Sequence, residues 1–268
     1  MGGQKPQAFL RRALWNVSAL EMAVKPADDG EVIAQWGFPD ERQSWSWDEP
    51  KRLMQVHLYS TRCACVFVAL NGRNVSEGCV SVSRATDYTA TVKVPYEPGT
   101  LEATGVDAHG RVLATQTFQT AGAPAQLRLT ADRTALTASR ADLSYVVAEV
   151  VDSAGVLVTC ANESVHAACV PPTIRFEIDG PGEIAAVGSG DPIDPGSFYA
   201  VDADGAMPRR SYRGRATAIV RPGQGPAAAG KPAGHLRSPE AGILTITAKA
   251  AGLTSATLVL QVGSGSGI

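Results

Sequence analysis

The feature that most restricts how this chain can fold is an alternation of apolar and polar residues with period two, repeated between residues 54 and 262. Residues 54–59 (MQVHLY) are a clear example. Such alternation is typical of half-buried strands, because successive side chains point to opposite faces of a sheet. Further strands are expected at residues 63–70, 89–94, 101–106, 112–118, 126–130, 144–151, 173–178, 183–187, 216–220, 243–248 and 256–262.

Turn residues separate these strands at the spacing of a β-sandwich. Asn71-Gly72 is a strong hairpin signal, and residues 107–110 (DAHG) form another. Residues 121–124 (AGAP) read as a compact linker between two strand series. We therefore expect an all-β chain with two immunoglobulin-like β-sandwiches in tandem, over residues 21–122 and 124–264.

One short N-terminal helix is expected over residues 6–15 (PQAFLRRALW). Its apolar face consists of Phe9, Leu10, Ala13 and Leu14. A helix this short cannot bury such a face alone. We therefore expect residues 1–20 to be the end of an element that lies upstream, and its apolar side chains to lack a partner within this chain.

Charge and hydropathy argue against two classes of partner, nucleic acids and membranes. The chain has 24 Lys and Arg against 26 Asp and Glu, a net charge of −2, whereas a nucleic-acid binder needs a basic face. The sequence also has no apolar run long enough to cross a membrane. The first six residues lack the apolar segment of a signal peptide, and the compartment is left open.

Five cysteines are an odd and sparse set for a chain of 268 residues, so most are expected to be reduced and buried. Cys63 and Cys65 would point the same way on one strand, with His57 nearby, but a zinc site needs four ligands. Cys160 and Cys169 could form a disulfide only in an oxidising compartment. With no phosphate loop or dinucleotide fingerprint either, we predict no metal and no cofactor.

Acidic residues offer no convincing catalytic pair. Three adjacent pairs occur, at residues 28–29, 40–41 (Asp40-Glu41) and 48–49. Neighbours on an extended segment point to opposite faces, so these are interpreted as solvated loop acids. Residues 202–205 (DADG) resemble the start of a calcium loop but lack its distal glutamate. No catalytic residue is predicted in this chain.

A series of ordered motifs carries a family resemblance. They are residues 36–40 (WGFPD), 44–47 (SWSW), 56–60 (VHLYS), 70–72 (LNG), 94–99 (VPYEPG), 120–124 (TAGAP), 127–133 (LRLTADR), 180–192 (GPGEIAAVGSGDP) and 213–220 (RGRATAIV). Together they resemble the C-terminal region of glycoside hydrolase family 2 β-galactosidases. The opening residues 3–15 are similar to the segment of that family that closes the (β/α)₈ barrel.

The resemblance implies a domain assignment and a role. Residues 1–20 would be the remnant of the last barrel helix, 21–122 the family's small sandwich of unknown function, and 124–264 its terminal immunoglobulin-like domain. The two catalytic glutamates of the family lie on barrel strands upstream of this sequence, and no glutamate here has their motif. We therefore expect a non-catalytic accessory region that packs on a catalytic barrel. The alternative is a stand-alone carbohydrate- or protein-binding module.

Trp36, Trp45 and Trp47 are the candidate substrate-binding residues, because aromatic faces stack on sugar rings and these three lie in one segment. The ligand would be a β-galactoside glycan, as the resemblance implies. The alternative interpretation is that the three side chains anchor the segment and fill the domain interface.

Overall fold

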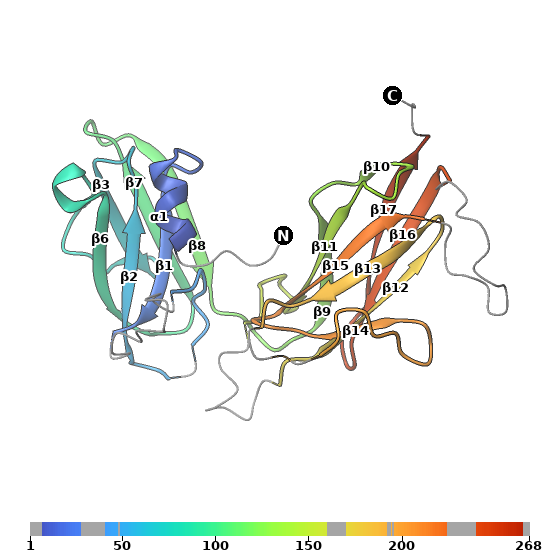
Figure 1. Cartoon of the computed structure of the whole chain (residues 1–268). Coiled ribbons are helices and arrows are strands. Elements are labelled where there is room, and N and C mark those ends of the chain that lie inside the picture. The colour runs from blue at the N-terminus through green and yellow to red at the C-terminus, as the bar shows by residue number, and fades with distance from the viewer. Residues whose placement is uncertain are drawn as a thin grey trace. The chain divides into compact units, whose positions relative to one another are not determined.

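The computed structural model describes residues 7–27, 41–47, 49–159, 170–191, 194, 196–223 and 240–264. The chain divides into two compact units, one ending at Ala121 and the other beginning at Gly122 (Figure 1). Both are built almost entirely of antiparallel strands, and the expected all-β architecture of two sandwiches and one short helix is confirmed. The domain boundaries at residues 20, 122 and 124 stay a prediction.

The first unit contains two facing sheets. One has the order β1 (Glu21–Pro26), β2 (Leu53–Tyr59) and β6 (Thr89–Pro95). The other has the order β4 (Arg73–Asn74), β3 (Cys65–Leu70), β7 (Thr100–Val106) and β8 (Val112–Gln119), with β5 (Val80–Ser81) also paired to β3. A 3₁₀ turn, η1 (Arg84–Thr86), lies between β5 and β6.

The alternation of residues 54–59 has the predicted consequence. Met54, Val56 and Leu58 are fully buried in a core that both sheets share, while the intervening side chains face outward. The predicted hairpin at Asn71-Gly72 joins β3 to β4, and both residues have the positive φ angles that such a turn requires. Strand β1 was not predicted, because its sequence EMAVKP contains glutamate, lysine and proline, which are rare in strands.

Helix α1 (Gln7–Leu14) packs on the outer face of strands β1 and β2 (Figure 1). Phe9 is 4% exposed and Ala13 is fully buried, against Ala23 of β1 and Tyr59 of β2. The expectation that its apolar face lacks a partner within the chain is therefore wrong for Phe9 and Ala13 and for the partly buried Leu10, since the unpredicted β1 helps to form the docking surface. Leu14 is 45% exposed, as expected.

The second unit is also a two-sheet structure. One sheet has the order β13 (Gly182–Gly188), β15 (Arg215–Pro222), β11 (Ser144–Val151) and β9 (Gln126–Ala131). The other has the order β10 (Ala135–Thr137), β17 (Ala256–Gly263), β16 (Gly242–Lys249), β12 (Thr173–Asp179) and β14 (Met207–Arg210). Only the β10–β17 pair among these described strands is parallel.

The core of this unit comes from alternate positions of the central strands. Its fully buried residues include Val146, Ala148, Val150, Ile174, Phe176, Ala216, Ala218, Val220, Leu244, Ile246 and Leu260. The short strands β10 and β14 were not predicted, because three or four residues are too few to show an alternation. Among the described residues, no helix is long and apolar enough to span a bilayer.

Candidate functional site

Trp45 is an internal anchor of the first unit. Its side chain is fully buried, and its indole N–H donates to the Glu97 carbonyl at 2.9 Å. Its ring meets Tyr96 edge-on, with centroids 5.1 Å apart. The Trp45 carbonyl accepts a hydrogen bond from Thr120 at 2.7 Å, which ties the segment to the end of the unit. In this arrangement the ring is enclosed by protein on all sides.

Trp47 has a different environment. It is half-buried against the same core, and the Arg42 guanidinium lies 5.2 Å from the centre of its ring. The indole N–H of Trp47 is buried and has no hydrogen-bond partner among the described residues. Trp36 lies outside the described residues. The substrate contact predicted for these three tryptophans stays a prediction.

A buried carboxylate cluster lies next to this segment, and sequence reasoning missed it. Glu41 is only 4% exposed, so its interpretation as a solvated loop acid is wrong. Its carboxylate lies 3.0 Å from His57 Nδ1 and accepts a hydrogen bond from the Tyr59 hydroxyl at 2.7 Å. Backbone hydrogen bonds of 2.8 and 2.9 Å between Val24 and Arg42 hold the segment beside β1 and thereby place Glu41.

The electrostatics of this cluster favour an ionised Glu41. Burial by itself raises the pKa of Glu41, but the hydrogen bonds from His57 and Tyr59, together with Coulombic attraction from His57 and Lys25, outweigh it and leave the pKa below its usual value. Burial and the adjacent carboxylate raise the pKa of Tyr59, so its hydroxyl stays a donor. The cluster is thus a charge-assisted connection between β2 and residues 41–47.

A second buried carboxylate, Glu21, connects helix α1 to the sheet. It is 2% exposed and accepts hydrogen bonds from Arg12 and Ser18, each at 2.6 Å, and from Gln43 at 2.7 Å. These partners come from α1, from the segment after α1, and from residues 41–47, called here the tryptophan segment. Both buried acids are therefore occupied by internal contacts, and each joins elements that are distant in sequence.

The acidic loop of residues 202–205 is likewise engaged by protein groups. Arg175 donates to Asp202 at 2.7 Å and to Asp204 at 2.6 Å. The hydrogen bonds from Arg175, with those from the backbone of Ala206 and Asp204, lower the pKa of Asp202. Within the described ranges, no group of three histidine, cysteine or acidic residues could hold a metal ion.

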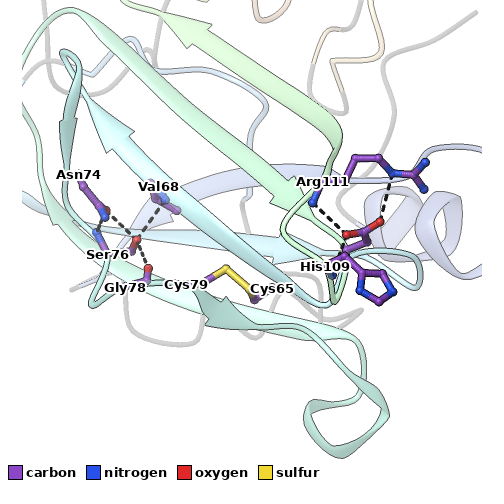
Figure 2. The surroundings of a disulfide bond; sticks show 9 residues. Cys65, Val68, Asn74, Ser76, Gly78, Cys79, His109 and Arg111 are labelled. Carbon is purple, nitrogen blue, oxygen red and sulfur yellow. Dashed lines mark hydrogen bonds and ion pairs between the residues drawn. A yellow bond between two sulfur atoms is a disulfide. The ribbon is translucent and has the colours of Figure 1, made fainter.

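The cysteines depart from expectation. Cys65 and Cys79 form a disulfide, so the expectation of reduced thiols is wrong for this pair (Figure 2). Cys63 lies before β3 and is buried as a free thiol, and so the two neighbouring cysteines do not share one strand face. The chain folds back after β3 so that β5 pairs with it in antiparallel orientation, and this brings Cys79 to Cys65. The spacing of the cysteines in the sequence does not reveal that pairing. Cys160 and Cys169 lie outside the described residues.

Two exposed aromatic side chains project from the segment between β13 and β14. Phe198 is 51% and Tyr199 70% exposed, with ring centroids 6.5 Å apart. The guanidinium of Arg209, a buried residue, lies 4.8 Å from the Phe198 ring and is held by Asp194 at 3.2 Å and by the Gly196 carbonyl at 2.8 Å. The aromatic pair is therefore presented from a fixed base.

Two family models match the chain. The model described as Glycoside hydrolase family 2 C-terminal domain 5 matches residues 127–259, within the second unit. The model described as Domain of unknown function (DUF4982) matches residues 51–114, within the first. Each match thus falls inside one of the two compact units.

Curated proteins and solved structures point the same way. The chain is 32% identical over 154 residues to beta-galactosidase BoGH2A of Bacteroides ovatus, covering 58% of the chain and 16% of that protein. A glycosyl hydrolase family 2 member from Bacteroides cellulosilyticus matches 97% of the chain with TM-score 0.73 and 27% identity, over 30% of its own length. A beta-glycosidase from Bacteroides vulgatus shares the fold, with TM-score 0.69 and 19% identity over 96% of the chain and 26% of its own length.

Proposed function

This chain corresponds to the C-terminal region of family 2 glycoside hydrolases, as its motifs predicted, and we propose that it is the non-catalytic accessory part of a β-galactosidase-like enzyme. It spans 16% of the curated relative and 30% of the solved relative, so the activity of the whole protein is part of this proposal. Its role would be to pack on and stabilise the catalytic barrel.

The state of the buried acids supports a structural role. A retaining glycosidase needs one carboxyl group free to act as nucleophile and a second free to act as acid and base. Glu21 and Glu41 are instead enclosed and hydrogen-bonded to side chains of their own unit. They hold α1 and the tryptophan segment on the first sheet, so their role is structural.

The end of helix α1 supports packing against another domain. Leu14, Trp15 and Val17 are 45%, 72% and 60% exposed within four residues of sequence. The backbone there is fixed, because Val17 N–H donates to the Arg12 carbonyl at 2.8 Å and Thr61 donates to the Ala13 carbonyl at 3.0 Å. A fixed apolar cluster on a surface marks an interaction site. We assign it to the catalytic domain, since this region is the C-terminal part of longer glycosidases.

The packing role is tested by Trp15→Ser in the complete enzyme that contains this chain, with Val112→Ser as the control. Val112 is 57% exposed but lies at the β7–β8 hairpin of the same unit. Trp15→Ser should lower the unfolding temperature of the catalytic domain, whereas Val112→Ser should not. Equal unfolding temperatures for the wild type and both variants would contradict the assignment of this surface.

The non-catalytic role is tested on the isolated chain with an aryl β-galactoside. We expect no hydrolysis above that of a mock preparation. Turnover that follows the protein through successive purification steps would overturn the proposal. A substrate contact of Trp36, Trp45 or Trp47 has to be tested in the complete enzyme, which contains the catalytic site. There, Trp47→Phe should raise KM if the unpaired indole N–H meets the sugar, and leave KM unchanged if it does not.

A second candidate function is glycan binding by the chain itself, and the aromatic pair on the second unit favours it. Phe198 and Tyr199 expose rings from a fixed base, and aromatic rings stack on the apolar faces of sugars. Affinity electrophoresis in a β-galactan gel should show retardation that Tyr199→Ala abolishes. Tyr145→Ala is the matched control, since Tyr145 is a 36% exposed tyrosine on β11 of the same unit. Equal mobility with and without the glycan would exclude this function.

A further inference from the structure

The backbone brings Cys65 and Cys79 together through the pairing of two short strands. Cys65 begins β3 and pairs with Ser81 of β5, so Cys79 lies just beyond the end of the paired residues. The two Cα atoms are 5.4 Å apart, within the range that disulfides span, and the sulfur atoms are bonded. The pairing of β3 with β5 thus brings the residues just before β5, Cys79 among them, beside the start of β3.

The loop that carries Cys79 is held in place by its own hydrogen bonds (Figure 2). Ser76 Oγ donates to the Gly78 carbonyl at 2.7 Å and accepts from the Val68 N–H at 3.1 Å. The Asn74 side chain in turn accepts a hydrogen bond from the Ser76 N–H at 3.0 Å. These contacts hold the loop against β3 through hydrogen bonds that do not involve either cysteine.

The third cysteine of this unit is kept out of the pairing. Cys63 is 5% exposed, and its sulfur lies 3.7 Å from the Ala19 carbonyl and fills the space where Gly105 would carry a Cβ. Cys65 and Cys79 are instead half-buried, within reach of a small thiol reagent. A thiol must be accessible to exchange with a disulfide. The unit therefore offers one pair for oxidation and shields the remaining thiol.

We propose that Cys65 and Cys79 form a permanent structural cystine and that this chain matures in an oxidising compartment, outside the reducing cytosol. Disulfides persist in such compartments and are rare where thiol reductants are abundant. The bond forms by exchange: one thiolate attacks a donor disulfide, and the second displaces the donor sulfur from the mixed disulfide. The two thiols lose two protons and two electrons in total, and the donor disulfide is reduced to two thiols.

The consequence for substrate class rests on the proposed function. An enzyme that carries this chain would meet its β-galactoside glycans outside the cytosol. The cystine itself is independent of that role, because its evidence is the geometry of the first unit. Its test therefore reads the chemical state of the cysteines and requires no glycosidase activity.

The first experiment maps the cysteines in cells of the source organism. Intact cells are treated with a membrane-permeant alkylating reagent, and the protein is then digested without reduction. We expect a peptide pair linked through Cys65 and Cys79, with Cys63 labelled only after denaturation. Free, alkylated Cys65 and Cys79 in these cells would overturn the proposal.

The second experiment measures what the bond contributes to stability in the purified chain. The double variant Cys65→Ser/Cys79→Ser should raise the unfolding equilibrium constant of the first unit on the order of 100-fold, because the bond closes a loop between residues that are 14 positions apart in sequence. Wild-type protein treated with a reductant should change equally. Cys63→Ala is the control. The reductant should lower its stability by the same amount as it lowers that of the wild type. Identical stability of the oxidised wild type and the double variant would contradict a structural cystine.

Discussion

The docking of helix α1 yields the sharpest quantitative test of this structure. Phe9 is 4% exposed and packs with Ala13, Ala23 and Tyr59, so Phe9→Ala removes the largest side chain that α1 contributes to that contact. Phenylalanine-to-alanine changes in protein cores cost about 3–5 kcal/mol. Because this cluster lies at the edge of the unit, where neighbours can relax into the space, we expect the lower end, about 3 kcal/mol.

The assay follows urea unfolding of the chain by tryptophan fluorescence. All four tryptophans precede residue 121, so the signal reports on the first unit even if the second unfolds separately. Leu14→Ala is the matched control on the same helix, because Leu14 is 45% exposed and should cost no more than about 0.5 kcal/mol. Equal effects of Phe9→Ala and Leu14→Ala would refute the docking of α1 on β1 and β2.

Three further predictions follow from the same unit. The pKa of Glu41 is lowered in the folded protein, so ionised Glu41 contributes to folding stability above about pH 5, and this contribution is lost as the pH falls through the folded pKa. The difference in unfolding free energy between the wild type and Glu41→Gln, measured by urea unfolding at several pH values, should therefore shrink below about pH 4. A gap that widens below about pH 4 would contradict this. Trp45→Ala should cost about 3–5 kcal/mol in the same assay, since the side chain is fully buried, and a cost below about 1 kcal/mol would show that it is not an anchor. Gly105→Ala should destabilise the chain because its Cβ would meet the Cys63 sulfur, and adding Cys63→Ala should restore part of the loss; additive effects of the two changes would argue against that contact.

The local pattern of the sequence predicted most of the strands. Alternation identified β2, β6, β7 and the long strands of the second unit to within one or two residues, because the side-chain period is a property of a single strand. Turn chemistry placed the hairpin at Asn71-Gly72 for a similar reason. The ordered motifs were enough to assign the family.

The candidate site was less accessible to sequence reasoning. Asp40-Glu41 is an acidic pair in a loop, and nothing in its neighbours indicates that Glu41 is enclosed by His57 and Tyr59. Glu21 was missed together with β1. A signal did exist for the cluster, since His57 and Tyr59 alternate on the outward face of a predicted strand and two polar residues there can bind a shared acid.

What the sequence determined by itself was the position of most of the long strands, their inward and outward faces, and the ordered motifs that carry the family resemblance. Only the tertiary structure decided the partners: Phe9 against Ala23 and Tyr59, Glu41 between His57 and Tyr59, and Cys65 with Cys79 rather than with Cys63. The physical reason is that alternation is fixed by the geometry of one strand, whereas a partner is chosen by the register between strands and by the path of the loops. Those depend on the free energy of the whole assembled unit.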